Sequence, residues 1–241
     1  MHVPDGFLDA PTSLATGAAA VVCVGAALRG ARRELDDRTA PMAGLVAAFI
    51  FAAQMLNFPV GAGTSGHLLG GALAAALVGP WTAILCMSTV FLVQCLLFAD
   101  GGITALGTNI MLMGVTTVAV GWLVMRLLQL VLPKRVGLVP LQAGAAALVS
   151  VPVAALLFVA LYAGGGTADI PLDRLASAMV GVHVLIGIGE AAITALAIGS
   201  IIAVRPDLVR IARPLLAARE LEIRTPAGEQ GDRSDRSGAA A

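Results

Sequence analysis

Charged residues are scarce in this sequence, and their scarcity excludes most classes of soluble protein. Only 12% of the 241 residues are charged, whereas 58% are hydrophobic. Soluble domains ordinarily carry roughly 25% charged residues. The hydrophobic residues also form long runs without charge, which are typical of membrane-spanning segments. The net charge is zero, so nothing indicates a nucleic-acid partner, and we expect an integral membrane protein.

Cysteine motifs for metals or disulfides are also lacking. The three cysteines, Cys23, Cys86 and Cys95, lie within hydrophobic runs and form no CxxC pair. Because their number is odd, we interpret them as small apolar packing residues. The sequence has no HExxH motif either, which argues against a zinc metalloprotease.

Basic residues are absent from the beginning of the chain, where the first is Arg29. A cleaved signal peptide begins with a positively charged region. We therefore expect Met1 to be the amino terminus of the mature protein. The metal site inferred below depends on this expectation.

The uncharged hydrophobic runs predict an all-α, polytopic transmembrane helical bundle. They cover residues 12–28, 42–57, 68–78, 81–98, 103–132, 141–162 and 176–204. Six of these runs have lengths that can cross a hydrocarbon core of roughly 30 Å. The run 68–78 is too short to cross as a helix alone, because a helix rises only about 1.5 Å per residue.

The basic residues predict the topology, because Lys and Arg concentrate in cytoplasmic loops. They lie in groups at 29–38, 126–135 and beyond 204, with Arg174 as the exception. If all three groups are cytoplasmic, an even number of crossings separates Arg38 from Arg126, so the short run at about 68–78 must cross too. The Gly- and Pro-rich segment 58–67 would lead into it, and such broken elements mark binding sites in transporters. We predict seven spans, with the amino terminus outside and the carboxyl terminus cytoplasmic.

These boundaries divide the chain into three parts. Residues 1–11 form an extracellular segment, residues 12–204 the transmembrane domain, and residues 205–241 a cytoplasmic, Arg-rich tail. Apolar residues are interspersed among the arginines of 205–224, so we expect this stretch on the inner membrane surface or against a partner. Residues 225–241 are polar and small, which predicts disorder.

His2 makes the amino terminus a chelator, and it is one of only three histidines. The amine of Met1, the amide nitrogen of His2 and the His2 ring can bind one ion together, closing two small fused rings. Such a planar set of nitrogens suits Ni(II) or Cu(II), and also Co(II). A further ligand is needed, and His67 can supply it. The alternative is that His2 is an exposed terminal residue without function.

The remaining candidates are polar residues near or within the spans. His67 follows a glycine-rich stretch, where backbone can come close to a bound group. His183 lies inside the last run, where an ionisable residue is a functional candidate. Ser65, Asp100, Asn109 and His183 are expected to support the ligands rather than to bind the metal themselves.

Four motifs resemble one family of transport proteins. They are MHVPDGFL at residues 1–8, GTSGHLLGG at 63–71, QCLLFADGGITALGTN at 94–109 and HVLIGIGE at 183–190. In this order they resemble the nickel/cobalt substrate-binding (S) components of energy-coupling-factor transporters, the CbiM/NikM family. The resemblance extends from residue 1 to about residue 204.

The resemblance implies a function and partners. Such a subunit binds Ni(II) or Co(II) as its substrate, outside the cell, through the Met1 amine, the His2 amide and ring, and His67. It is not an enzyme and holds no cofactor, and it resides in a bacterial or archaeal inner or plasma membrane. A transmembrane coupling protein and ABC ATPases supply the energy, and some systems add a small membrane subunit.

Two other functions are compatible with parts of the sequence. An intramembrane serine protease would use Ser65 of a GxSG pattern with His183 as the base, but it leaves Met1, His2 and His67 without a role. A stand-alone metal channel would share the binding residues and dispense with the ATPases.

Overall fold

The hydrophobic runs fold as helices in the computed structural model, which describes residues 1–35, 39–61 and 64–224. The α-helices are α1 (Ala10–Ala31), α2 (Thr39–Gln54), α3 (Gly71–Val78), α4 (Pro80–Phe98), α5 (Leu106–Asn109), α6 (Thr117–Val131), α7 (Val139–Gly165), α8 (Leu172–Val204) and α9 (Arg213–Arg224). A π-helical stretch, η1 (Ile110–Thr116), joins α5 to α6. The short 3-10 turns are η2 (Val136–Leu138), η3 (Pro206–Leu208) and η4 (Arg210–Ala212). The described chain is overwhelmingly helical, as predicted.

Five helical stretches within the described residues are long and apolar enough to cross a membrane. They are Ala10–Ala31, Pro80–Phe98, Leu106–Val131, Val136–Gly165 and Leu172–Val204. The apolar helix α2 is shorter, with 16 residues, and α3 has only 8, or about 12 Å of rise. Helix length therefore supports five spans and does not confirm the predicted seven.

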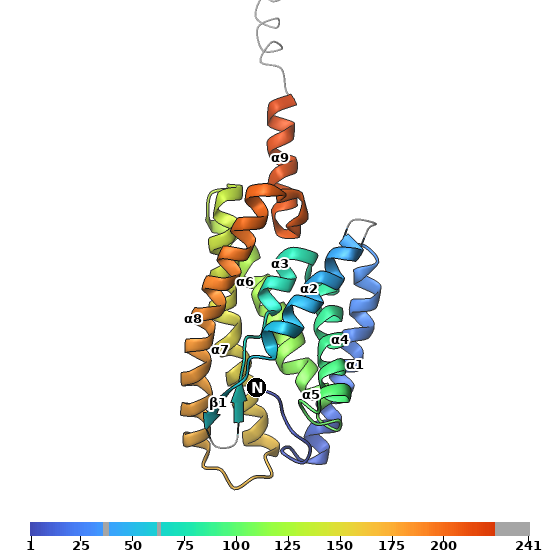
Figure 1. The fold of residues 1–241 in the computed structure, drawn as a ribbon, viewed down its shortest axis with the longest axis vertical. Coiled ribbons are helices and arrows are strands. Elements are labelled where there is room, and N and C mark those ends of the chain that lie inside the picture. Colours follow the sequence, from blue (N-terminus) through green and yellow to red (C-terminus); the bar gives the residue numbers. More distant parts are fainter. Residues whose placement is uncertain (36–38, 62–63, 225–241) are drawn as a thin grey trace, which may run out of the picture.

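The helices pack side by side along the long axis of the molecule (Figure 1). In the figure, α7 and α8 run together on one side of the bundle, and α1 and α4 on the other. The short helix α3 lies between them and contacts α2, α4, α6 and α7. The amino terminus lies beside the strands within the bundle, whereas α9 projects from the opposite end.

The centre of the bundle is built from small residues, which permits close helix contacts in a membrane protein. Every residue of α3 is buried. A Cβ added to Gly121 would lie 2.8 Å from the Cβ of Ala72, so α3 and α6 meet almost backbone to backbone. Many large apolar side chains face outward as well, with Leu97 75% exposed and Leu130 79% exposed. This inverted distribution fits a surface covered by lipid.

The segment before α3 is not helical, as its Gly and Pro content predicts. Two strands, β1 (Phe58–Gly61) and β2 (Thr64–Gly66), form an antiparallel hairpin. The following residues are irregular, and α3 begins only at Gly71, three residues into the run predicted at 68–78. The cause is Gly70, which has a φ of 82°, a left-handed conformation that interrupts helix geometry.

The carboxyl-terminal stretch does not lie entirely on a surface as expected. Val209 and Ala212 are fully buried, and η4 packs against α3. The Gln129 side-chain amide donates to the Ile211 carbonyl at 3.1 Å, and the Arg210 guanidinium donates to the Glu34 carbonyl at 3.1 Å. Apolar residues between the arginines therefore insert into the end of the bundle. The predicted disorder of 225–241 lies outside the described residues.

Candidate metal site at the amino terminus

The first three residues are buried inside the protein. Met1 is 1% exposed, His2 8% and Val3 0%. The side chain of Asn109 holds both backbone groups of Val3, accepting from its N–H at 2.7 Å and donating to its carbonyl at 3.1 Å. The N–H of Gly102 also donates to the Val3 carbonyl at 2.9 Å. Both backbone polar groups of Val3 are thus hydrogen-bonded, as they would be in a β-strand, and this holds the terminus in place.

The residues after Val3 form a turn that ties the terminus to its neighbours. The N–H of Phe7 donates to the Pro4 carbonyl at 3.3 Å, and Gly6 supplies the positive φ of 74°. The Asp5 carboxylate accepts from the backbone N–H of Thr104 at 2.7 Å. Hydrogen bonds from the Thr104 hydroxyl and from the Thr104 backbone N–H lower the pKa of Asp5, which keeps its carboxylate ionised. The hydrogen bonds of Val3 and this turn together restrict the conformational freedom of the first residues.

The rings of His2 and His67 lie close together, tilted against each other, at the buried end of this segment. Their centroids are 4.8 Å apart with an interplanar angle of 33°, and Phe91 packs edge-on against His2 at 5.9 Å. Nδ1 of His67 lies 2.8 Å from the Leu68 carbonyl. Since a carbonyl only accepts, Nδ1 carries the proton and Nε2 keeps a lone pair. That Nε2 is buried without a hydrogen-bond partner, so its lone pair is available to a ligand.

The free amine and His2 are unprotonated at neutral pH. Burial lowers the pKa of the Met1 amine from 8.0 to about 5, although the Asp100 carboxylate opposes this shift. Burial and the nearby amine lower the pKa of His2 to about 3. Removal from water penalises the charged form of each base. Both groups therefore offer lone pairs, which is the state in which they can bind a cation.

The loop after α4 supports His2 from its outer side. Oδ2 of Asp100 lies 3.5 Å from Nε2 of His2. Gly101 has a φ of 90°, and a Cβ there would lie 3.0 Å from Nδ1 of His2 and 2.8 Å from the Asn109 amide nitrogen. Only glycine fits such a conformation beside such close neighbours. Asp100 and Asn109, predicted as supporting residues, thus contact the terminal segment directly.

His183 and Ser65 have different outcomes. His183 on α8 is fully buried, and its Nδ1 pairs with the Met179 carbonyl at 2.7 Å while Nε2 has no partner. It lies near enough to the Met1 amine and to His67 for electrostatic interaction. The side chain of Ser65 lies outside what the structure describes. The Ser65–His183 pair of the protease alternative is therefore not tested.

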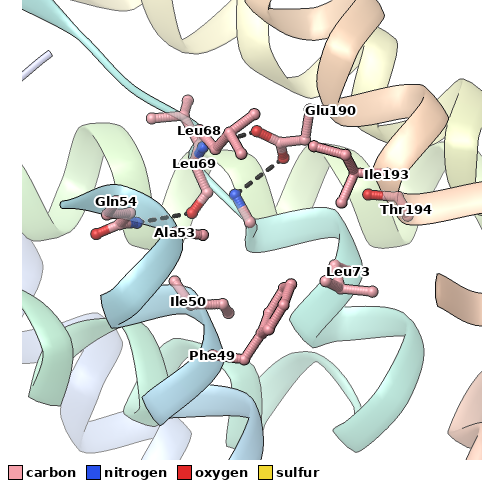
Figure 2. A pocket seen from close by; sticks show the side chains of 11 residues that line it. Phe49, Ile50, Ala53, Gln54, Leu68, Leu69, Leu73, Glu190, Ile193 and Thr194 are labelled. Carbon is pink, nitrogen blue, oxygen red and sulfur yellow. Dashed lines mark hydrogen bonds between the residues drawn. The ribbon is translucent and has the colours of Figure 1, made fainter. Parts of the chain in front are cut away.

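The donor set consists mainly of nitrogen atoms from the terminus. The described residues contain no group of three His, Cys, Asp or Glu side chains that could hold a metal. The donors that the site offers in place of such a cluster are two imidazoles, the Met1 amine and one backbone amide. Two buried glutamines that the sequence motifs did not single out support the segment after His67: Gln54 donates to the Leu69 carbonyl (Figure 2), and Gln94 donates to Gln54. A polar residue inside an apolar run was the available signal.

Comparisons with known proteins identify the family of this chain. Residues 2–208 match the family model CbiM, described as the cobalt uptake substrate-specific transmembrane region. A putative metal transport protein of Haloquadratum walsbyi is 42% identical over 87% of this chain and 93% of its own. A putative fused nickel transport protein NikMN of Archaeoglobus fulgidus is 36% identical over 87% of this chain and 68% of its own.

A solved structure has the same fold. The crystal structure of a truncated transition metal transporter superposes with a TM-score of 0.76 at 31% identity, covering 84% of this chain and 99% of that one. The family match spans most of the sequence, including the terminal histidine and the helices that enclose it. The chain therefore belongs to the CbiM family of cobalt uptake substrate-specific transmembrane regions.

Proposed function

We propose that this chain is the substrate-capturing subunit of an energy-coupling-factor importer for Ni(II) or Co(II). The ion binds to the Met1 amine, the His2 amide and Nδ1, and Nε2 of His67. The observation that carries the proposal is the burial of an unprotonated amine and two imidazoles together, with their ring nitrogens largely unpaired. Burying such groups is costly unless a partner satisfies them, and a metal ion is that partner.

The chemistry of the set selects a class of metal. Nitrogen ligands in a plane favour Ni(II) and Cu(II) and accept Co(II). Nδ1 of His2 closes a small ring with its own amide, which leaves Nε2 to donate to Asp100. A carboxylate behind a ligating imidazole orients the ring and strengthens it as a ligand. The names of the matched family and of the Archaeoglobus relative, which refer to cobalt and nickel, fit this range.

The finer topology is part of the same proposal. Helix α2 and the unit formed by residues 58–78 complete seven spans in a bacterial or archaeal inner or plasma membrane. The terminal segment 1–11 then lies outside, the domain 12–204 spans the membrane, and 205–241 faces the cytoplasm. A coupling protein and ABC ATPases supply the energy there.

Metal content of the purified protein tests the proposal. Full-length protein with its native terminus and a carboxyl-terminal tag is expected to retain about one Ni(II) or Co(II) per chain, measured by elemental analysis after washing. Their ratio after equal exposure indicates the preferred ion. Purified protein that contains neither ion, and that binds neither ion when it is added back, would contradict the proposal.

The lowered pKa values predict an unusual pH dependence. Above about pH 5 only the His2 amide still releases a proton when the metal binds. Metal affinity is therefore expected to fall about tenfold for each pH unit by which the pH is lowered. Below about pH 5 the Met1 amine also takes up a proton, and the fall steepens to about a hundredfold. Calorimetry in buffers of different ionisation enthalpy counts the protons released. A steep dependence already between pH 8 and pH 6 would mean that the amine is solvated, contrary to the structure.

A further inference from the structure

A buried carboxylate on α8 holds the backbone that follows His67. Glu190 is 2% exposed and accepts from the N–H of Leu69 at 2.7 Å and from the N–H of Gly70 at 2.9 Å. Both hydrogen bonds appear in Figure 2, where α8 approaches the irregular segment before α3. Each oxygen of the Glu190 carboxyl group thus accepts one backbone N–H, so the side chain anchors two successive peptide units of this segment.

Two glutamines hold the same segment from the opposite side. The Gln54 amide on α2 donates to the Leu69 carbonyl at 2.8 Å. The Gln94 amide on α4 in turn donates to the Gln54 side-chain oxygen at 3.0 Å. Both glutamines are fully buried. The segment is thus fixed between α8 on one side and α2 with α4 on the other, as Figure 2 shows for Gln54 and Glu190.

One peptide unit connects Glu190 to the His67 ring. The Leu68 carbonyl accepts from Nδ1 of His67 at 2.8 Å. The N–H of Leu69 belongs to the same peptide plane, and it donates to Glu190 at 2.7 Å. A peptide bond is planar and resonant, so a hydrogen-bond acceptor at its N–H side increases electron density at its oxygen. Chains of hydrogen bonds polarise one another in this way.

We propose that Glu190 is a positioning residue for His67, acting through the Leu68–Leu69 peptide unit. It fixes the plane of that peptide and makes the carbonyl a better acceptor for the His67 Nδ1 proton. The ring is thereby oriented, and its Nε2 becomes a stronger donor to a metal. This is the role that a carboxylate commonly plays behind a metal-bound histidine, with a peptide unit placed between. The inference rests on the proposed function of His67 as a ligand.

A competing explanation is that Glu190 only satisfies backbone groups before α3. The protein contains a matched case of that simpler role. Glu34 is a buried carboxylate, 6% exposed, that accepts from the N–H of Thr82 in the first turn of α4 at 2.7 Å. That turn lies at the other end of α4 from Asp100. Glu34→Gln therefore reports the cost of losing a buried backbone anchor without any connection to His67.

The experiment compares Glu190→Gln with Glu34→Gln in the full-length protein. Ni(II) affinity is measured by competition with a chelator, and the ligand field by the visible absorption of bound Ni(II). Glu190→Gln is expected to weaken binding about tenfold and to shift the absorption to lower energy. Glu34→Gln should lower the thermal stability only. Glu190 and Thr194 line one pocket together with Leu69, and the Thr194 hydroxyl has no hydrogen-bond partner. Thr194→Val should therefore change neither property.

Further variants keep the result decisive. Glu190→Asp retains the carboxyl group on a shorter side chain, so an intermediate spectral shift is expected. This variant replaces Glu190→Gln if the Gln variant does not fold. Native affinity and absorption in both Glu190 variants, or an equal loss in Glu34→Gln, would overturn the inference. His67→Ala is the reference variant. If it binds Ni(II) normally, the proposed function fails. If His67→Ala loses affinity while both Glu190 variants bind normally, only the inferred role of Glu190 fails.

Discussion

His67→Ala is expected to abolish tight binding of Ni(II) and Co(II). In the proposed site, His67 supplies the one ligand that comes from outside the terminal segment, and its Nε2 is buried and unpaired beside His2. Changes to groups behind a ligand cost about 10–100-fold in metal affinity, so loss of the ligand itself should exceed about 100-fold. His2→Ala removes the chelate ring and should have a similar effect. Equilibrium dialysis with elemental analysis measures both.

Asp100→Ala provides the graded comparison. Its carboxylate lies 3.5 Å from Nε2 of His2 and contacts the metal donors only through that ring. We therefore expect affinity to fall about tenfold and not to disappear. A His67→Ala protein with native nickel affinity would refute the four-nitrogen site. An Asp100→Ala protein as defective as His67→Ala would instead place the carboxylate among the ligands.

The helices were largely predictable because lipid imposes a simple rule on sequence. A span must be uncharged and satisfy its own backbone hydrogen bonds, so runs such as 81–98 and 176–204 coincide closely with α4 and α8. The short run was less predictable. Its first three residues are apolar but not helical, because Gly70 takes a left-handed conformation and Glu190 binds the N–H groups of Leu69 and Gly70. That partner is distant in the sequence, and periodicity contains no information about it.

The candidate site was predictable in its residue types but not in its support. The terminal Met1-His2 pair is a chelator by its chemistry, and a glycine-rich stretch before His67 indicated a close approach. The double hydrogen bond between Asn109 and Val3 joins residues 106 positions apart, which no spacing rule predicts. Gln54 and Gln94 were overlooked because each is a single polar residue within an apolar run. Their importance follows only from the irregular backbone that they hold.

An amino-terminal extension should abolish metal binding without altering any side chain. Adding three residues, Met-Ser-Ser, before Met1 converts its amine to an amide and moves the free amine away from His2. The Met1 side chain is only 1% exposed, so the pocket has no room for the added chain either. The loss in affinity should match that of His2→Ala, exceeding about 100-fold. Elemental analysis of the purified extended and native proteins measures it.

The same extension separates a ligand role of the terminus from a packing role. Three residues added at the carboxyl terminus are the control and should leave metal content unchanged, because α9 projects away from the site (Figure 1). If the extended protein unfolds at a lower temperature than His2→Ala, packing contributes to its loss, and formylated native Met1 then tests the amine alone. Equal metal in extended and native proteins would mean that the terminus is not a ligand. The site would then have to be built from His67 and His183, whose Nε2 atoms are both buried and unpaired.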